Sequence, residues 1–168
     1  MAWTDPASFS NLEVVTFTKL NTHLRDNMRE LWHELAYVEF TSNVSVTATT
    51  EATANSIVSA GALTYVANPI FIEFECYAWA HDTAVGDLDL VLYDGSTSQG
   101  LLWEHKFATS GGAIGGLRTA RRLTPTAASH TYSIRGFTNT GTATVSAGVG
   151  GVGAAMPGFI RITQKGGA

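Results

Sequence analysis

Charged side chains are scarce in this chain. Only 14% of its 168 residues are Asp, Glu, Lys or Arg, whereas 45% are hydrophobic, and the surface of a solvated monomer is normally richer in charge. We therefore expect part of the surface to be buried in an oligomer. The formal net charge of -4 gives no attraction to phosphate backbones or anionic lipids, so neither nucleic acid nor a membrane is expected as a partner.

Cysteine is almost absent. Cys76 is the single cysteine, which excludes an intrachain disulfide and a thiolate metal cluster. In the alternating run 72–79 it shares a strand face with Ile72, Phe74 and Ala78. A free thiol on such a face packs as a small apolar side chain, so we expect Cys76 to be buried and unreactive.

The sequence also shows no pattern typical of a targeting signal or a membrane-spanning segment. The opening MAWTDPASFS has neither the basic start nor the apolar core of a secretory signal, and no apolar run approaches membrane-spanning length. We expect a protein that is made and folded in a cytoplasm.

Metal-binding motifs are incomplete. His33 and Glu34 begin the zinc-protease pattern, but Tyr37 stands where the second histidine ligand belongs. Carboxylates at 82, 87 and 89 could contact Ca²⁺, yet their spacing lacks the 12-residue loop and its terminal Glu. We expect polar strand and loop positions there and no bound metal.

Catalytic motifs are incomplete as well. The glycine-rich run 111–116 lacks the Lys-Ser/Thr pair of a phosphate-binding loop. No Ser, His and acidic residues occur in a context that suggests nucleophilic catalysis. We therefore expect no enzyme activity and no cofactor.

The first feature that is present is a charged, amphipathic segment, which predicts a helix over 18–36. Thr16 or Thr18 can cap its start, and the β-branched and aromatic run 37–40 marks a change to extended chain. Counted in sevens, its apolar residues form a seam that suits a coiled coil, or an amphipathic helix packed on its own domain or on a partner. The helix seam consists of Leu24, Met28, Leu31, Trp32 and Leu35.

The rest of the chain alternates with the period of two that half-buried strands require. Leu88, Leu90 and Leu92 alternate with residues 87, 89 and 91, which are Asp, Asp and Val, before an Asp94-Gly95 turn. Similar runs predict strands near 38–49, 55–67, 70–80, 87–93, 101–108, 117–124, 130–137, 142–149 and 158–164. The uncharged, glycine-rich stretch 141–158 suits either a loop or a strand in close contact with another backbone.

Eight or nine short strands at this spacing predict a mainly β fold, a jelly roll or β-sandwich, preceded by one N-terminal amphipathic α-helix. We accordingly divide the chain into an anchor segment with its helix, 1–37, and a β domain, 38–168.

Two groups of residues are candidates for contacts. Three arginines could pair with carboxylates of a partner or belong to a solvated strand end, namely Arg118, Arg121 and Arg122. Aromatic side chains expected on exposed faces could stack on sugar rings or contact another subunit, and the low charge favours subunit contact. These are Tyr77, Trp79 and Trp103, with His105 beside them.

Two resemblances add to this interpretation. The segment 13–28 contains Val-Val-Thr, Lys-Leu-Asn and Leu-Arg-Asp-Asn in succession, and it resembles the "VVT…KLN…LRDN" start of structural proteins of tailed bacteriophages, often placed after a Trp such as Trp3. The later chain resembles the trimeric jelly roll of the tumour-necrosis-factor and C1q kind. The similarity lies in the aromatic strand 74–79, the Leu-Tyr-Asp-Gly turn at 92–95 and the closing strand 158–162.

The second resemblance implies a homotrimeric head. The chain differs from secreted members of that family because it lacks a signal, a collagen-like stalk and paired cysteines. A virion protein made in the host cytoplasm needs none of these.

Together these features suggest a non-enzymatic structural protein of the virion: a homotrimeric capsid decoration or head-spike protein bound to a major capsid or tail protein. Its particle anchor would be Trp3, Phe9, Leu12 and Val14. The alternative is a tail fibre or receptor-binding protein, or a carbohydrate-binding module that uses exposed Trp residues to hold a host-surface glycan.

Overall fold

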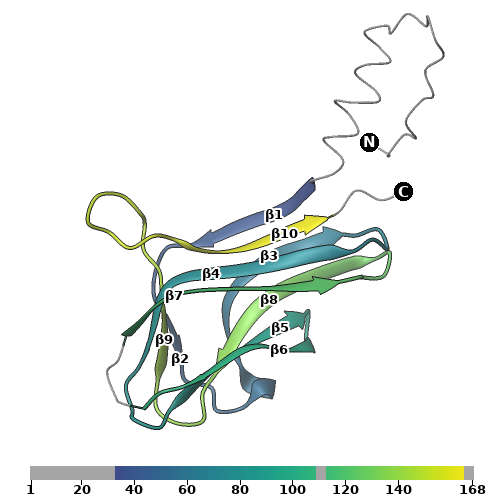
Figure 1. Cartoon of the computed structure of the whole chain (residues 1–168). Helices are drawn as coiled ribbons and strands as arrows, with labels where there is room; N and C mark the ends of the chain where they lie inside the picture. The colour runs from purple at the N-terminus through teal and green to yellow at the C-terminus, as the bar shows by residue number, and fades with distance from the viewer. Residues whose placement is uncertain (1–32, 109–112, 165–168) are drawn as a thin grey trace, which may run out of the picture.

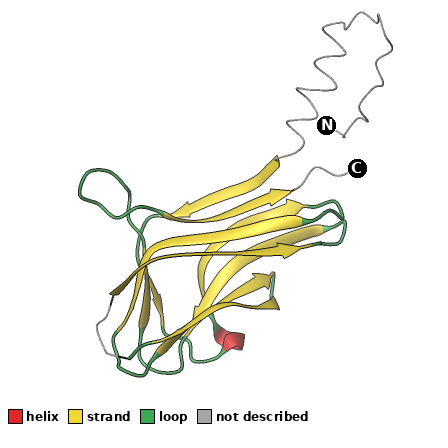
Figure 2. Cartoon of the chain, in the orientation of Figure 1, coloured by secondary structure: helices red, strands yellow, loops and turns green. Residues whose placement is uncertain are grey.

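The computed structural model describes residues 33–108 and 113–164. These residues form ten strands and one short 3-10 helix (Figures 1 and 2). The elements are β1 (His33–Phe40), β2 (Val44–Val46), η2 (Glu51–Thr53), β3 (Asn55–Thr64), β4 (Ile70–His81), β5 (Asp87–Asp94), β6 (Thr97–Lys106), β7 (Ala113–Leu123), β8 (Ser129–Phe137), β9 (Ala143–Ser146) and β10 (Gly158–Gln164).

The strands form two antiparallel sheets. Sheet A has the order β1-β10-β4-β9-β2, with β7 paired to the other edge of β4, and sheet B has the order β3-β8-β5-β6. The prediction of a mainly β, two-sheet fold is confirmed. Among the described residues no helix is long and apolar enough to cross a membrane.

The core lies between the two sheets. Ile72 and Phe74 of β4 and Ile160 of β10 are almost fully buried, as are Leu90 of β5 and Ile134 of β8 in sheet B. Burying each such side chain contributes about 1.5–3 kcal/mol, and alternation along the strands directs one side chain in two toward this layer. Cys76 lies in the same core, as its sequence context predicts.

The expected strand positions agree with most of the observed ones. The range 38–49 is instead two strands, because residues 41–43 leave the ladder: β1 pairs with β10 and β2 pairs with β9. The Asn43 side-chain oxygen at this break accepts a hydrogen bond from the backbone N–H of Ala147. Strand β6 begins at Thr97 rather than near 101, because the chain reverses within two residues after Asp94.

The expected helix over 18–36 lies mostly outside the described residues, and its last four residues contradict the prediction. Residues 33–36 belong to β1, where His33 pairs with Gln164 and Ala36 with Ile162. Leu35 packs against the core of the sandwich. Backbone hydrogen bonding to β10 therefore determines the conformation of residues 33–36, despite their helical periodicity.

The other residues assigned to the helix seam and the particle anchor also lie outside the described ranges. They are Leu24, Met28, Leu31 and Trp32 of the seam, and Trp3, Phe9, Leu12 and Val14 of the anchor.

Candidate functional site

The outward side of sheet A carries a group of charged and aromatic side chains. Paired residues of an antiparallel ladder point to the same side, so the register defines this surface, which we call the outer face. Its members by register are Tyr37 and Glu39 on β1, Phe159, Arg161 and Thr163 on β10, Phe71, Glu73 and Glu75 on β4, and Arg118, Ala120 and Arg122 on β7. We add Tyr77, which is exposed two residues beyond Glu75 on β4.

Glu73 is the centre of the outer face. Its Oε2 accepts hydrogen bonds from Arg161 Nε at 2.8 Å and Nη2 at 2.5 Å, and its Oε1 accepts one from Arg118 Nη2 at 2.6 Å. Arg118 also lies 3.9 Å from a carboxylate oxygen of Glu75. The two guanidinium groups thus hold the Glu73 carboxylate in a fixed orientation.

The pKa of Glu73 reflects this arrangement. Partial burial acts to raise the pKa of the carboxyl, but the hydrogen bonds from Arg118 and Arg161 outweigh it and hold the pKa below its ordinary value. The carboxylate stays ionised at neutral pH, and the centre of the outer face has its opposite charges paired.

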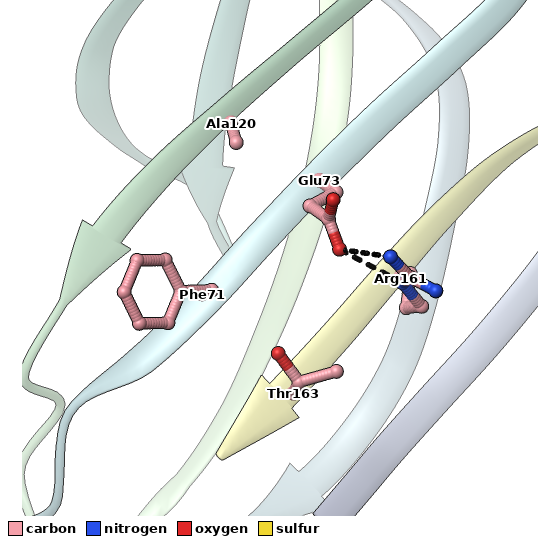
Figure 3. A pocket seen from close by; sticks show the side chains of 5 residues that line it. All are labelled: Phe71, Glu73, Ala120, Arg161 and Thr163. Atoms are coloured by element: carbon pink, nitrogen blue, oxygen red, sulfur yellow. Dashed lines mark hydrogen bonds and ion pairs between the residues drawn. The ribbon is translucent and has the colours of Figure 1, made fainter. Parts of the chain in front are cut away.

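A hollow of about 350 Å³ lies next to this ion pair. Figure 3 shows its lining: the Phe71 ring on one side, Glu73 and Arg161 on the other, and Thr163 and Ala120 at its margins. An aromatic ring beside fixed polar groups is the usual composition of a small binding site. Arg161 is one-third exposed and its side chain remains accessible from the hollow.

Exposed aromatic rings surround the centre. Phe71 is 43% exposed, Tyr37 46% and Tyr77 53%. The Tyr37 ring packs on Phe159, with 5.0 Å between centroids. The outer face therefore exposes three large aromatic rings around its paired charges.

The three candidate arginines do not form one cluster. Arg118 and Arg122 lie on the outer face, opposite Glu75 and Phe71 respectively. Arg121 points the other way, and its Nη1 donates to the backbone carbonyl of Gln99 on β6. Arg118 pairs with two carboxylates of its own chain, those of Glu73 and Glu75. The expected contact between these arginines and a carboxylate of a partner stays a prediction.

The prediction that Trp79 lies on an exposed face is wrong. Trp79 is only 2% exposed, and its ring contacts those of Trp103, His105 and Phe107 at centroid distances of 4.5, 4.3 and 4.6 Å. Trp103 is half-buried against it and packs on the core. These rings join the sheets from inside, so Trp79 offers no platform to a sugar.

Trp79 is buried because the alternation of buried and exposed residues shifts by one position along β4. Buried residues occupy even-numbered positions up to Cys76, and then odd-numbered positions at Trp79 and His81. β4 pairs with β10 up to Glu75 and with β9 from Ala78 onward. The shift of the buried positions falls between these two residues. Tyr77 stays exposed, and its assignment to a subunit contact stays a prediction.

The carboxylates considered for Ca²⁺ have separate surroundings. Asp82 Oδ1 accepts hydrogen bonds from the Thr83 hydroxyl and the Thr142 N–H, and Asp87 exchanges hydrogen bonds with Asn139. Within the described residues no three His, Cys, Asp or Glu side chains are grouped to hold a metal. His33 and Glu34 lie on a strand, so they lack the helical spacing of the zinc motif.

Asp89 is buried on sheet B, and its Oδ1 has no hydrogen-bond partner. Burial raises the pKa of Asp89 to about 6, with further contributions from Asp87 and Glu104. Burial also raises the pKa of the Cys76 thiol to about 11, which makes it a poor nucleophile at neutral pH.

One constellation was not predicted from the sequence. His130 Nδ1 lies 2.6 Å from Asp94 Oδ2, and its Nε2 lies 3.1 Å from the Thr126 hydroxyl, an order that superficially matches a catalytic triad. The acceptor-only carbonyl oxygen of Thr126 lies 3.2 Å from the same Nε2. These hydrogen bonds join the β5–β6 hairpin to the chain before β8, so we interpret the group as a clasp between these two segments.

No protein-family model matches the chain, and no curated protein sequence matches it. Solved structures give distant similarities. A carbohydrate-binding module of Cellvibrio mixtus lichenase 5A, in complex with cellotriose, is 14% identical over 77% of this chain and 97% of that chain, with a TM-score of 0.36. The C-terminal domain of EclA, a sugar-binding protein, is 11% identical over 76% and 81%, with a TM-score of 0.35.

A structure of the Gx strain of infectious bursal disease virus is 10% identical over 81% of this chain and 32% of that chain, with a TM-score of 0.34. Similarities this low carry no inference about family or ligand.

Proposed function

We propose that this chain is a non-enzymatic structural protein of a tailed-bacteriophage particle, with a homotrimeric head. The N-terminal segment would attach it, as a capsid decoration or head spike, to a major capsid or tail protein of a virion assembled in the host cytoplasm. The bacteriophage assignment rests on the resemblance of segment 13–28 to the start of phage structural proteins.

The strand pairing supports a jelly-roll head. β1 pairs with β10, β3 with β8, β4 with β7, and β5 with β6. Each pair lies inside the previous one along the chain, which is the pattern of a long antiparallel hairpin rolled into two sheets. This topology agrees with the jelly roll implied by the second resemblance.

The observation that carries the homotrimer is the outer face. It leaves Phe71, Tyr37 and Tyr77 half-exposed around a Glu73 carboxylate whose charge is already paired. Aromatic residues are enriched at the centres of protein interfaces, and a neutralised centre can be buried without leaving a charge unpaired. The low charged fraction of the chain favours the same conclusion.

Light scattering on the full-length chain tests this proposal. At micromolar concentration we expect a mass of three times 17.8 kDa. Phe71→Glu or Tyr77→Glu should shift the protein toward monomer, because each places an unpaired charge in the interface. Leu101→Glu is the matched control, since Leu101 is 50% exposed on β6 of sheet B. A monomeric wild-type chain would contradict the homotrimer.

A receptor-binding function is the second candidate, and the hollow is the observation that favours it. The Phe71 ring can stack on a sugar, while Thr163, Arg161 and Glu73 can exchange hydrogen bonds with its hydroxyl groups. The head would then hold a host-surface glycan at this site rather than on exposed tryptophans.

A glycan array distinguishes the two candidates. Glycan binding should be lost in Phe71→Ala and retained in Leu101→Ala if the hollow is a sugar site. Suppose instead that the wild-type protein binds a glycan and that Phe71→Glu remains a trimer. The subunit interface would then lie elsewhere, and the receptor-binding function would be favoured. An array without any bound glycan leaves the structural function as the better supported.

A further inference from the structure

The segment 147–157 between β9 and β10 forms a loop that extends from the end of the sandwich (Figure 1). The loop is closed by its own backbone: Gly148 N–H donates to the Met156 carbonyl at 3.0 Å, and Gly150 N–H donates to the Ala155 carbonyl at 2.9 Å. A Cβ at Gly148 would lie 2.5 Å from the Ala155 oxygen, so this close approach requires glycine. The loop therefore has a defined hairpin-like path.

Its end is apolar and exposed. Val152 is fully exposed, Val149 is 74% exposed and Met156 is 62% exposed; we call these three residues the apolar tip. No charged residue occurs between Arg135 and Arg161 in the sequence. A protruding, uncharged group of aliphatic side chains marks an interaction site.

The chemistry of the tip favours a protein partner over a lipid surface. Segments that lie in membrane interfaces usually carry Trp, Tyr or Phe together with Lys or Arg. The loop contains none of these residue types. A recess that has apolar walls and whose charges are paired within its own chain is a better complement to the tip.

The outer face provides such a recess. Phe71 and Ala120 contribute apolar surface to the hollow, and Glu73 is neutralised by Arg161 and Arg118. A neutral tip could therefore enter without burying an unpaired charge. The loop ends where β10 begins at Gly158, about 16 Å along the strand from Thr163 in the hollow, and it extends away from the sandwich, so the tip must come from another copy.

We propose that the apolar tip of one copy inserts into the outer-face hollow of the next copy. This contact joins two different surfaces, so three copies can close a ring by repeating it. The proposal rests on the homotrimer proposed above and identifies which surfaces meet.

Cysteine cross-linking in the full-length protein tests the contact. Val152→Cys combined with Ala120→Cys, oxidised under native conditions, should give covalent dimers and trimers on a non-reducing gel. The only native cysteine, Cys76, is buried. Val66→Cys with Ala120→Cys is the matched control, because Val66 is a half-exposed valine on the β3–β4 connection, and it should give no cross-linked trimer.

A second variant measures the contribution of the tip without cross-linking. Val152→Asp should weaken trimer assembly by at least about tenfold, whereas Val66→Asp should leave assembly unchanged. If light scattering shows a trimer that neither cross-links through this pair nor responds to Val152→Asp, the tip contact is refuted while the homotrimer stands. A monomeric wild-type chain would instead refute the homotrimer itself.

Two further outcomes would also overturn the contact. Covalent dimers from Val152→Cys alone would mean that two tips meet each other. Flotation of the wild-type protein, but not of Val152→Asp, with phosphatidylcholine and phosphatidylglycerol vesicles would assign the tip to a lipid surface.

Discussion

Replacing Glu73 with Gln should destabilise the β-sandwich by removing the charge at the centre of the outer face. The Glu73 side chain is 16% exposed, and Arg161, its better buried partner, donates two hydrogen bonds to it. Hydrogen bonds to charged groups contribute about 1.5–3 kcal/mol, so we expect a loss of about 2 kcal/mol from this pair. Arg118 is largely exposed, and its contact should add little.

The pH dependence of this effect has a defined sign. Because the folded-state pKa of Glu73 is lowered, its contribution is fully present above the unfolded-state pKa of about 4.3. It is lost as the pH falls through the folded-state pKa. The difference in unfolding free energy between wild type and Glu73→Gln should be constant from about pH 6 to pH 8 and shrink below about pH 4.

Urea unfolding followed by tryptophan fluorescence, at one fixed protein concentration, measures this difference. A double-mutant cycle with Arg161→Gln isolates the pair, and we expect a coupling energy of about 1–2 kcal/mol. A coupling near zero, or a Glu73→Gln effect that persists unchanged at low pH, would refute the assignment of Glu73 as the electrostatic centre.

Three further predictions concern positions away from the outer face. Val85 has a φ of 66°, which is costly for a β-branched residue, so Val85→Asn should raise the free energy of unfolding by about 1 kcal/mol; unchanged or lower stability in urea would contradict this strain. Asp89 has a raised pKa of about 6, so the fold loses stability as the pH rises from about 4, near the unfolded-state value, to about 6; Asp89→Asn should be more stable than wild type at pH 8, and this advantage should disappear by about pH 4 in the same assay. Trp79→Ala removes the ring at the centre of the aromatic packing and should cost about 3–5 kcal/mol; a thermal melt that matches wild type would mean that this ring is not buried.

The strand pattern could be predicted from the sequence because it is a local property. Alternation and turn residues give most of the strand positions, including the Asp94-Gly95 reversal. Residues 33–36 show where local information fails: they fit a helical seam, yet they join β10, which lies more than a hundred residues later in the chain. Long-range pairing decided their conformation.

The candidate site could not be predicted in the same way. Glu73, Arg118 and Arg161 meet only because β4 lies between β7 and β10, and the sequence does not specify that register. Strict alternation does not place Trp79 correctly, because the buried positions of β4 shift by one after Cys76, where its pairing passes from β10 to β9. The apolar tip had a local signal, since segment 141–158 is uncharged and glycine-rich, but its exposure required the structure.

A density map at side-chain resolution of the particle that we propose to contain this chain would test the homotrimeric head. We expect a threefold head in which neighbouring copies cover the outer faces of sheet A, where Phe71 and Tyr77 are exposed in the single chain. A particle that lacks the chain, or a head whose outer faces are open to solvent, would contradict this expectation.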